Sequence, residues 1–411
     1  MKHIAVLSTL YYPDMGAPSA CIDKYVQALG DDYLFHIITR TDCSDFEPSK
    51  EYDVRYITSF RHRLILRCRD GINKGHRVLL CKVILGFINV FKLIQAQYSF
   101  PSAQRWEVNQ YAKQLEKLNK EVGVNVVFTV SNTAFPQLAT LRFKKHHPEV
   151  KWLSFFYDPY SPHYIYYKYK LFKPIWKILN KKKEQEIYDA ADAVLLSSEL
   201  YKFVTQHFRI NPTKCYPLLY PLNDLHCTRK MDNTQSSATC KLFFAGMFYK
   251  KIRNPEFALS TLSKVNGIRF DMFVGKGECE DIINKYITEN IHREEFVSHD
   301  RYVEMICNEY DVLVNVGNVS TLQAPSKMLE LLSTGKPILN FYFAKDSQYE
   351  MIEKYPLGLN IGLHEDGAVG KIERFCHEVK GKSIPYEEVE QLFPENCLDS
   401  QVALLKKLIE L

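Results

Sequence analysis

The sequence of 411 residues contains no apolar segment long enough to cross a membrane. Its most hydrophobic segment, residues 83–91, lies between Lys82 and Lys92 and is far shorter than the roughly 20 apolar residues of a membrane-spanning helix. The apolar run at residues 4–7 is also too short for the hydrophobic region of a signal peptide. We therefore expect a protein that remains in the cytoplasm.

Several short motifs are also absent. The eleven cysteines form no Cys-x-x-Cys pair, and no histidines accompany them at the spacing of a zinc site. An odd number of scattered cysteines is more typical of reduced thiols in the cytosol than of a disulfide framework. The loop after the first apolar run lacks Gly-x-Gly-x-x-Gly, which argues against a nicotinamide-dependent oxidoreductase. No nucleic-acid-binding signature occurs, so neither DNA nor RNA is expected as a partner.

The net charge of +5 is small, but the basic residues are concentrated in two segments. Residues 61–77 hold six Lys or Arg against one acid and lead directly into the apolar run 78–94, and residues 160–183 interleave Tyr and Trp with Lys. Basic and aromatic side chains beside apolar faces suit an anionic membrane surface, which makes 61–94 and 160–183 candidates for peripheral membrane binding. A core helix with solvated flanks explains the same pattern.

Apolar runs alternate with helical stretches along the whole chain. Continuous apolar runs are typical of parallel strands that are buried on both faces. We predict such strands at residues 4–10, 35–39, 124–130, 151–157, 193–197, 240–246, 270–275, 312–316 and 337–339. Their alternation with helices, for example at 107–122 and 169–191, predicts an α/β protein with doubly wound parallel sheets and with ligands at the carboxyl ends of the strands.

The length of the chain and one break in this pattern predict two domains. Between residues 206 and 239 prolines and a polar run interrupt the alternation, and we interpret this segment as a linker. The N-terminal domain then spans residues 1–205, and the C-terminal domain spans residues 240–397. Residues 398–411 carry a helical stripe of apolar side chains, which we expect to pack back on the N-terminal domain.

Residues 324–338, with the sequence APSKMLELLSTGKPI, are the most informative segment. A proline pre-sets the first turn of a short helix, Ser326 can cap that helix, and Gly335 can end it. The N-terminus of such a helix offers free N–H groups to a diphosphate, and Glu330 can accept hydrogen bonds from a ribose. Here the chain resembles the family-4 glycosyltransferases of the GT-B fold, whose donor-site signature has a Pro-Ser-Lys turn, a helix bearing Glu and a small-Gly-Lys-Pro ending.

The resemblance extends backward in the order that the family has. FFAG at 243–246 and KKIRNP at 250–255 resemble the family's glycine turn and the cation that neutralises the donor diphosphate. FVGKG at 273–277 resembles its second strand with a Gly-x-Gly ending, and YDVLV at 310–314 resembles the strand before the donor helix. The GT-B fold implied by the resemblance consists of two Rossmann-like domains that face a cleft.

The N-terminal half carries fainter similarities. Residues 12–19, YPDMGAPS, occupy the loop where the family has a glycine-bearing turn, here Gly16, although an ordinary turn explains the segment as well. The strand at 151–157 is followed directly by Asp158, where many relatives place a His or Asp that faces the reacting sugar. Capping of the next segment is an alternative role for Asp158. Glu184 resembles part of the family's last N-domain helix and is interpreted as scaffold.

The resemblance implies transfer of a sugar from a nucleotide sugar to a glycan or polyprenyl-linked acceptor, with retention of configuration, in surface polysaccharide biosynthesis. The N-terminal domain would bind the acceptor and the C-terminal domain the donor, on the inner face of the membrane. The implied catalytic residues are Asp158, Lys251 and Glu330. The implied donor-binding residues are Gly16, Gly246, Lys251, Arg253, Gly275, Gly277, Ser326, Lys327 and Glu330.

The sequence lacks a metal-binding Asp-x-Asp pair and departs from the family's pattern at Leu322. No Asp-x-Asp pair occurs, a pair that a metal-bridged diphosphate site would need, so we expect neither a metal nor another cofactor. Family members often carry a second Glu eight positions before the equivalent of Glu330, and this chain has Leu322 there. Leu322 leaves a second interpretation open, in which the chain is a non-catalytic GT-B-like partner subunit of a membrane glycan assembly.

Overall fold

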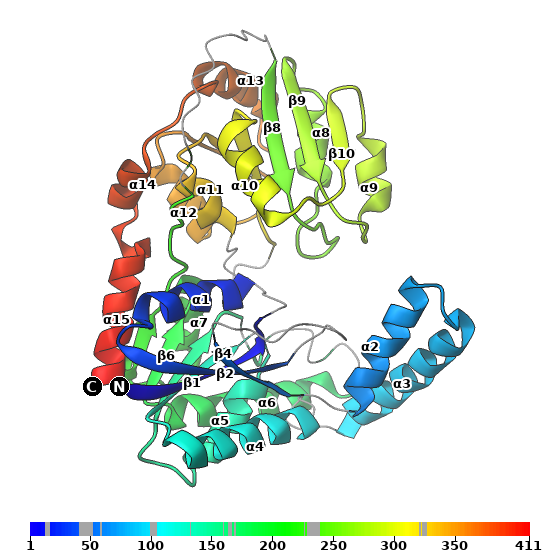
Figure 1. Cartoon of the computed structure of the whole chain (residues 1–411). Coiled ribbons are helices and arrows are strands. Elements are labelled where there is room, and N and C mark those ends of the chain that lie inside the picture. The colour runs from blue at the N-terminus through cyan, green and yellow to red at the C-terminus, as the bar shows by residue number, and fades with distance from the viewer. Residues whose placement is uncertain are drawn as a thin grey trace. The chain divides into compact units, whose positions relative to one another are not determined.

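The computed structural model describes residues 1–12, 17–40, 52–57, 60–98, 105–131, 133–158, 160–162, 167, 170–225, 227, 239–319, 322 and 327–411. The chain divides into two compact units, and each is built on a parallel sheet (Figure 1). The first unit comprises Met1–Leu219 and Gln401–Leu411, and the second comprises Tyr220–Ser400.

The first unit contains a seven-stranded sheet in the order β3-β2-β1-β4-β5-β6-β7, in which every strand pair is parallel. Its strands are β1 Lys2–Leu10, β2 Tyr33–Arg40, β3 Asp53–Ile57, β4 Val126–Ser131, β5 Lys151–Phe156, β6 Ala193–Leu196 and β7 Cys215–Pro217. Its helices are α1 Ala17–Leu29, α2 Phe60–Asn73, α3 Val78–Tyr98, α4 Arg105–Val122, α5 Phe135–Lys144, α6 Lys173–Ala190, α7 Ser198–His207 and α15 Leu398–Glu410.

Helices cover both faces of this first sheet. On one face Leu7 of β1 and Val127 of β4 belong to a core that also contains residues of α4, α5, α6 and α7. On the other face Ile4 of β1, Leu29 of α1 and Ile409 of α15 line one small cavity. The N-terminus of β1 is also tied to α15, because Lys2 Nζ donates to the carbonyl of Ile409 at 3.0 Å.

The second unit contains a six-stranded parallel sheet in the order β10-β9-β8-β11-β12-β13. Its strands are β8 Cys240–Ala245, β9 Ile268–Phe273, β10 Ile291–Glu294, β11 Val312–Val316, β12 Ile338–Tyr342 and β13 Gly358–Gly362. Residues of α8 Glu256–Leu262, α9 Glu280–Lys285 and α13 Ala368–Val379 form the core on one face. Residues of α10 His299–Asn308, α11 Lys327–Ser333, α12 Ser347–Lys354 and α14 Tyr386–Leu392 form the core on the other.

The fold class predicted from the sequence is confirmed as two doubly wound parallel α/β sheets. Every interior strand lies where the apolar runs predict one, whereas the four edge strands β3, β7, β10 and β13 were not predicted. Edge strands pair on one side only and carry polar or glycine residues, as in IHRE of β10. Because β7 lies within residues 206–239, part of the segment that we interpreted as a linker belongs to the first sheet.

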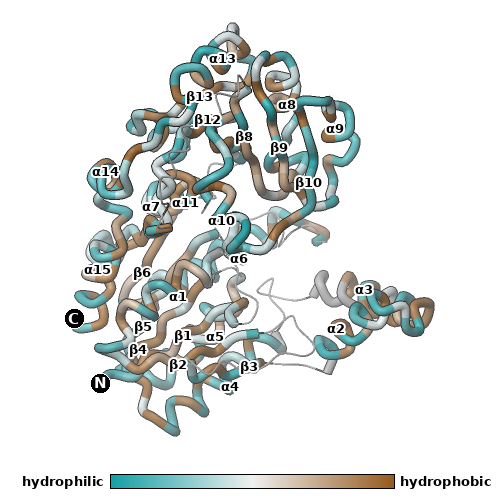
Figure 2. Tube along the Cα trace, turned by 45° about the horizontal axis from the view of Figure 1, so that its top comes forward, coloured by the Kyte–Doolittle hydropathy of each residue, from teal (hydrophilic) through white to brown (hydrophobic). Residues whose placement is uncertain are grey.

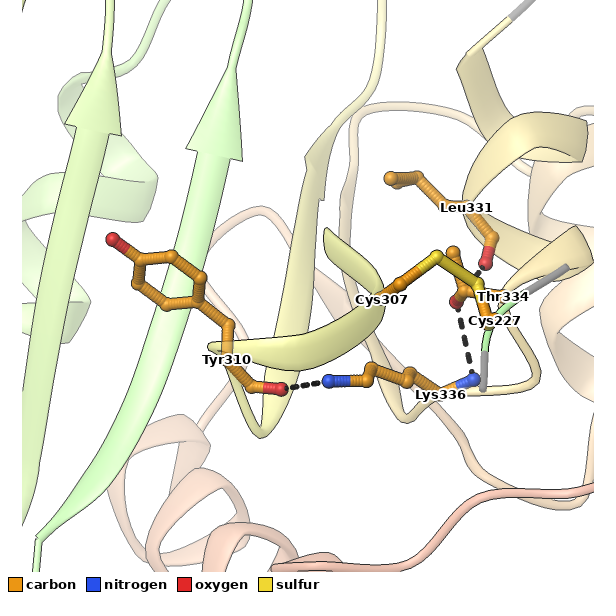
Figure 3. Close-up of a disulfide and its surroundings, with 6 residues drawn as sticks. All are labelled: Cys227, Cys307, Tyr310, Leu331, Thr334 and Lys336. Atoms are coloured by element: carbon orange, nitrogen blue, oxygen red, sulfur yellow. Dashed lines mark hydrogen bonds between the residues drawn. A yellow bond between two sulfur atoms is a disulfide. The ribbon is translucent and has the colours of Figure 1, made fainter. Parts of the chain in front are cut away.

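The cysteines differ from the sequence-based expectation in one respect. Cys227 and Cys307 form a disulfide, with their Cα atoms 5.1 Å apart, whereas the sequence predicted only reduced thiols (Figure 3). Eight other described cysteines are free. The two bonded cysteines are 80 positions apart, so only the fold, which brings the segment before β8 to the end of α10, reveals the pair.

A membrane-spanning helix is absent from the part of the chain that the structure describes, where no helix is both long and apolar enough.

Gly335 offers a test of the packing behind α11. Its φ is +68°, and a Cβ added there would lie 1.9 Å from the carbonyl oxygen of Ile384. Gly267 has a similar φ of +70° but nothing within 4 Å. We expect Gly267→Ala to lower the free energy of unfolding by about 1 kcal/mol through backbone strain, and Gly335→Ala to lower it by at least about 2 kcal/mol more through the clash. Urea unfolding of both variants measures the difference, and equal losses would contradict the packing.

Candidate functional site

The second sheet has a topological switch point at β8. Its neighbours are β9 on one side and β11 on the other, and the crossover helices α8 and α11 cover opposite faces of the sheet. In doubly wound sheets, ligands bind outside the carboxyl ends of the strands at this point. The loops after β8 and β11 and the start of α11 therefore form the candidate site.

The chain turns sharply after β8. Gly246 has a φ of +155°, and a Cβ at this position would lie 3.6 Å from Nη1 of Arg253. Tyr249 and Arg253 close a tight turn, in which Tyr249 N donates to Arg253 O at 3.1 Å and Arg253 N donates to Tyr249 O at 2.9 Å. This turn returns the guanidinium of Arg253 to the end of β8.

Arg253 also joins the two loops across the switch point. Its Nε donates to Oδ1 of Asn318, the second residue after β11, at 3.1 Å. The backbone N–H of Val319 donates to the carbonyl of Ile252 at 2.7 Å beside this bond. Burial lowers the pKa of the Arg253 guanidinium, although an arginine remains charged at neutral pH.

Lys327 brings a second cation to the same place. It is the first residue of α11, and its Nζ donates to the carbonyl of Ala245, the last residue of β8, at 2.8 Å. Burial lowers the pKa of Lys327, and Arg253 lowers it further, while Glu330 acts in the opposite direction. Lys327 and Arg253 line one small cavity together with residues of β8, β11 and Tyr302.

Glu330 lies one helical turn beyond Lys327 and is held by α10. The hydroxyl of Tyr302 donates to its Oε2 at 3.1 Å. Burial, and then the nearby Glu330 carboxylate, raise the pKa of Tyr302 well above its usual value, so this hydroxyl remains a proton donor. Tyr302 thereby fixes the orientation of a carboxylate that remains half-buried.

Lys251 and the Gly-x-Gly segment contribute differently from the other predicted residues. Lys251 is exposed and makes no hydrogen bond or ion pair with the described residues, whereas its neighbour Lys250 pairs with Asp281 at 2.8 Å. A Cβ on Gly275 would lie 3.0 Å from the sulfur of Met247, which brings the loop after β9 beside the loop after β8.

The amide of Gly277 already has an acceptor within the protein. Gly277 N donates to Oε1 of Glu280 at 3.0 Å, and the same carboxylate pairs with Arg293 at 2.7 Å. A helix of the chain itself thus satisfies the N–H group that a phosphate would otherwise use.

The remaining predicted residues lie elsewhere or outside the described residues. Gly16 and Ser326 fall outside them. Asp158 is half-buried and belongs to the first unit, where it follows β5 and Tyr157. Asn318 and Tyr302 were not singled out from the sequence. The position of Asn318 directly after an apolar strand was the available signal, while Tyr302 lies in α10, far from any motif.

Comparison with known proteins finds similarity at the level of structure alone. No protein-family model matches the chain. No curated protein sequence matches it either.

Three solved structures illustrate the similarity, each covering the whole of this chain. Sucrose-phosphate synthase from Thermosynechococcus elongatus superposes with a TM-score of 0.67 at 11% identity over 98% of its own chain. The lipopolysaccharide outer core galactosyltransferase WaaB gives 0.62 at 12% identity over 99% of its chain. UDP-GlcNAc 2-epimerase from Neisseria meningitidis bound to UDP-GlcNAc gives 0.51 at 10% identity over 100% of its chain.

These neighbours establish the fold of the chain as the GT-B type, which agrees with the resemblance seen in the sequence. They include transferases and an epimerase, and at such low identities the fold does not decide between activities.

The buried cations generate a prediction about stability. Because the pKa of Lys327 is lowered, folding disfavours its charged form, and an uncharged side chain of similar length removes that penalty. The lost hydrogen bond to Ala245 acts in the opposite direction and is worth about 1.5 to 3 kcal/mol. We therefore expect Lys327→Met to keep the free energy of unfolding within about 1 kcal/mol of wild type at pH 7, as measured in urea. A larger loss would make Lys327 a structural residue.

Proposed function

We propose that this protein is a glycosyltransferase that takes a sugar from a nucleotide-sugar donor. The observation that carries the proposal is the convergence of Arg253 and Lys327 on the carboxyl end of β8, at the switch point of the second unit. Two half-buried cations with lowered pKa values, beside a single carboxylate, suit a dianionic diphosphate. The transferases among the structural neighbours support the reaction class.

The proposed roles of the residues follow from where charge develops during sugar transfer. In glycosyl transfer the sugar passes through an oxocarbenium-like state while negative charge builds on the leaving diphosphate. Arg253 and Lys327, with the exposed Lys251 beside them, would stabilise that charge without a metal ion. Glu330, oriented by Tyr302, would accept hydrogen bonds from the ribose of the donor. We assign Asp158 to the reacting sugar and propose retention of configuration, with the leaving phosphate taking the acceptor proton.

Donor binding can be tested with two lysines that are matched in environment. Lys336 is also half-buried and donates to a backbone carbonyl, that of Tyr310, and burial lowers its pKa to about 8 (Figure 3). We expect UDP-sugars at 100 times their dissociation constant to stabilise wild type and Lys336→Met by about 2.7 kcal/mol. Lys327→Met and Arg253→Met should lose this stabilisation in a thermal-shift assay. Retention of the full shift in both site variants would contradict the assigned site.

Turnover provides a separate test of the same residues. With EDTA present, we expect Glu330→Ala and Lys251→Ala each to abolish sugar transfer, because one loses the ribose contact and the other a cation for the diphosphate. Lys250→Ala serves as the control for Lys251→Ala. Lys250 lies in the same loop as Lys251, but its ammonium group pairs with Asp281 of α9. Wild-type transfer in both site variants would contradict the assignment. Conversion of a UDP-sugar without an acceptor would instead indicate an epimerase.

For the acceptor we propose a glycan or polyprenyl-linked glycan of surface polysaccharide biosynthesis, presented at an anionic membrane. More than half of the exposed large apolar side chains in the described residues belong to α3 and to residues 171–179, which include the first turns of α6. Hydrophobic residues recur along the α3 tube in Figure 2. On α3 they include Leu80, Val83, Phe87, Val90 and Ile94, which recur every three or four residues on one face. The neighbouring α2 supplies exposed arginines that would attract anionic headgroups.

The start of α6 has the same character. Phe172, Ile175 and Ile178 are 75%, 56% and 70% exposed and form one stripe. Exposed lysines flank this stripe, among them Lys173 and Lys177. An apolar stripe with a basic border is typical of helices that lie in the plane of a membrane interface. These helices correspond to segments 61–94 and 160–183.

Vesicle binding tests this surface independently of catalysis. We expect wild type to cosediment at low salt with vesicles of phosphatidylcholine and phosphatidylglycerol, and to bind less in high salt because the headgroup attraction is screened. Ile175→Ser with Ile178→Ser should reduce binding several-fold, because the apolar stripe is lost. Ile287→Ser, the same type of substitution at an exposed isoleucine of the second unit, should not reduce vesicle binding. Failure of wild type to bind at low salt would contradict membrane docking.

We place the protein in the cytoplasm, peripherally on the inner membrane face. The free cysteines support a reducing compartment, whereas the Cys227–Cys307 disulfide is unusual for one. The alternative of a non-catalytic partner subunit rests on Leu322 alone, and it would gain support if donors bound but no transfer occurred.

A further inference from the structure

A buried polar network joins α6 to the loop that follows Asp158. Glu184 of α6 is only 1% exposed, yet its carboxylate accepts hydrogen bonds from three residues. Two donors are loop amides, Tyr160 N at 3.3 Å to Oε1 and Ser161 N at 2.9 Å to Oε2. The third is the hydroxyl of Tyr188, which lies one turn along the same helix and donates to Oε1 at 2.8 Å. One carboxylate thus holds the second amide and the third amide after Asp158.

A second side chain of α6 extends this network. Asn180 is fully buried, and its Oδ1 accepts from the hydroxyl of Tyr160 at 3.2 Å. Its Nδ2 donates to the hydroxyl of Tyr167 at 3.2 Å, and that hydroxyl donates in turn to the carbonyl of Ser161. Tyr160, Ser161 and Tyr167 are therefore bonded, directly or through one side chain, to a single face of α6.

The cost of this arrangement argues for a specific role. Burial raises the pKa of Glu184, and the hydrogen bonds from Ser161 and Tyr188 oppose that rise. A buried carboxylate is expensive to maintain, and an apolar residue at this position of a helix would stabilise the core at lower cost. What the carboxylate provides is a fixed geometry, because two N–H groups of an irregular loop find their acceptors at one rigid helix.

We infer that Glu184 is a positioning residue, which orients the Asp158 carboxylate by fixing the loop that follows it. This inference rests on the proposed function, in which Asp158 faces the reacting sugar. From the sequence we interpreted Glu184 as scaffold, and its hydrogen bonds to Tyr160 and Ser161 refine that role. In this role Glu184 acts on Asp158 through the residues that it bonds, chiefly through the backbone amides of Tyr160 and Ser161.

The test compares a loop-side variant with a helix-side variant. Glu184→Gln replaces one carboxylate oxygen by an NH₂ group, which cannot accept from a loop amide. Tyr160→Phe removes the loop hydroxyl bonded to Asn180, while Tyr188→Phe removes an equally buried hydroxyl that bonds only to Glu184 within the helix. We expect kcat to fall at least tenfold in Glu184→Gln and severalfold in Tyr160→Phe, with KM for the nucleotide sugar unchanged. Tyr188→Phe should lower kcat less than Tyr160→Phe does, because both loop amides keep their acceptor.

Hydrogen–deuterium exchange gives a readout that does not depend on activity. The amides of Tyr160 and Ser161 should exchange faster in Glu184→Gln than in wild type. Unchanged exchange, wild-type kcat in Glu184→Gln, or equal losses in Tyr160→Phe and Tyr188→Phe would each overturn the inference. If wild type binds UDP-sugars but transfers no sugar, both the proposed function and the catalytic part of this inference fail. Hydrogen–deuterium exchange still reports in that case whether Glu184 holds the loop.

Discussion

The hydrogen bond from Arg253 to Asn318 joins the loops after β8 and β11, two neighbouring strands that are followed by helices on opposite faces of the second sheet. After β8 the chain crosses over one face through α8, and after β11 it crosses over the other through α11. Right-handed crossovers on opposite faces carry these loops apart and leave polar groups exposed between them. Arg253, with the backbone bond from Val319 to Ile252, joins the loops, and the cavity shared with Lys327 lies at this junction.

The cations at this junction are held at some cost to the folded state. Burial lowers the pKa of both Arg253 and Lys327, and Glu330 is the carboxylate that opposes the shift of Lys327. Glu330 itself is bonded to Tyr302, so part of its accepting capacity is already used. A protein that stabilised itself alone would pair these cations more fully or replace them. An excess of positive charge at a strand switch point is typical of an anion-binding site.

In the first unit, the first turns of α6 are exposed and its later turns have a buried face. Its buried face carries Asn180 and Glu184, which hold the loop after β5. Its first turns expose Ile175 and Ile178 to solvent between lysines, and Phe172, directly before the helix, is exposed as well. The sequence showed only an interleaving of aromatic and basic residues in this region, which fits a core helix and a membrane-facing helix equally well. In the structure most side chains of α6 before Asn180 are exposed, whereas Asn180, Glu184, Ile187 and Tyr188 are buried.

The sequence by itself determined the interior strands of both sheets, because strands covered on both faces carry continuous apolar runs, such as IAVL in β1, VVF in β4 and VLV in β11. It also singled out Arg253, Lys327 and Glu330 as candidate donor-site residues through their order along the chain. It could not reveal the edge strands, which lack that burial, nor Asn318, Tyr302 and the Cys227–Cys307 bond. Those depend on side chains that meet only when distant segments pack together, and no local pattern encodes such meetings. Tertiary structure alone decided which cations converge, and that Lys251 remains exposed while Lys327 lines the cavity.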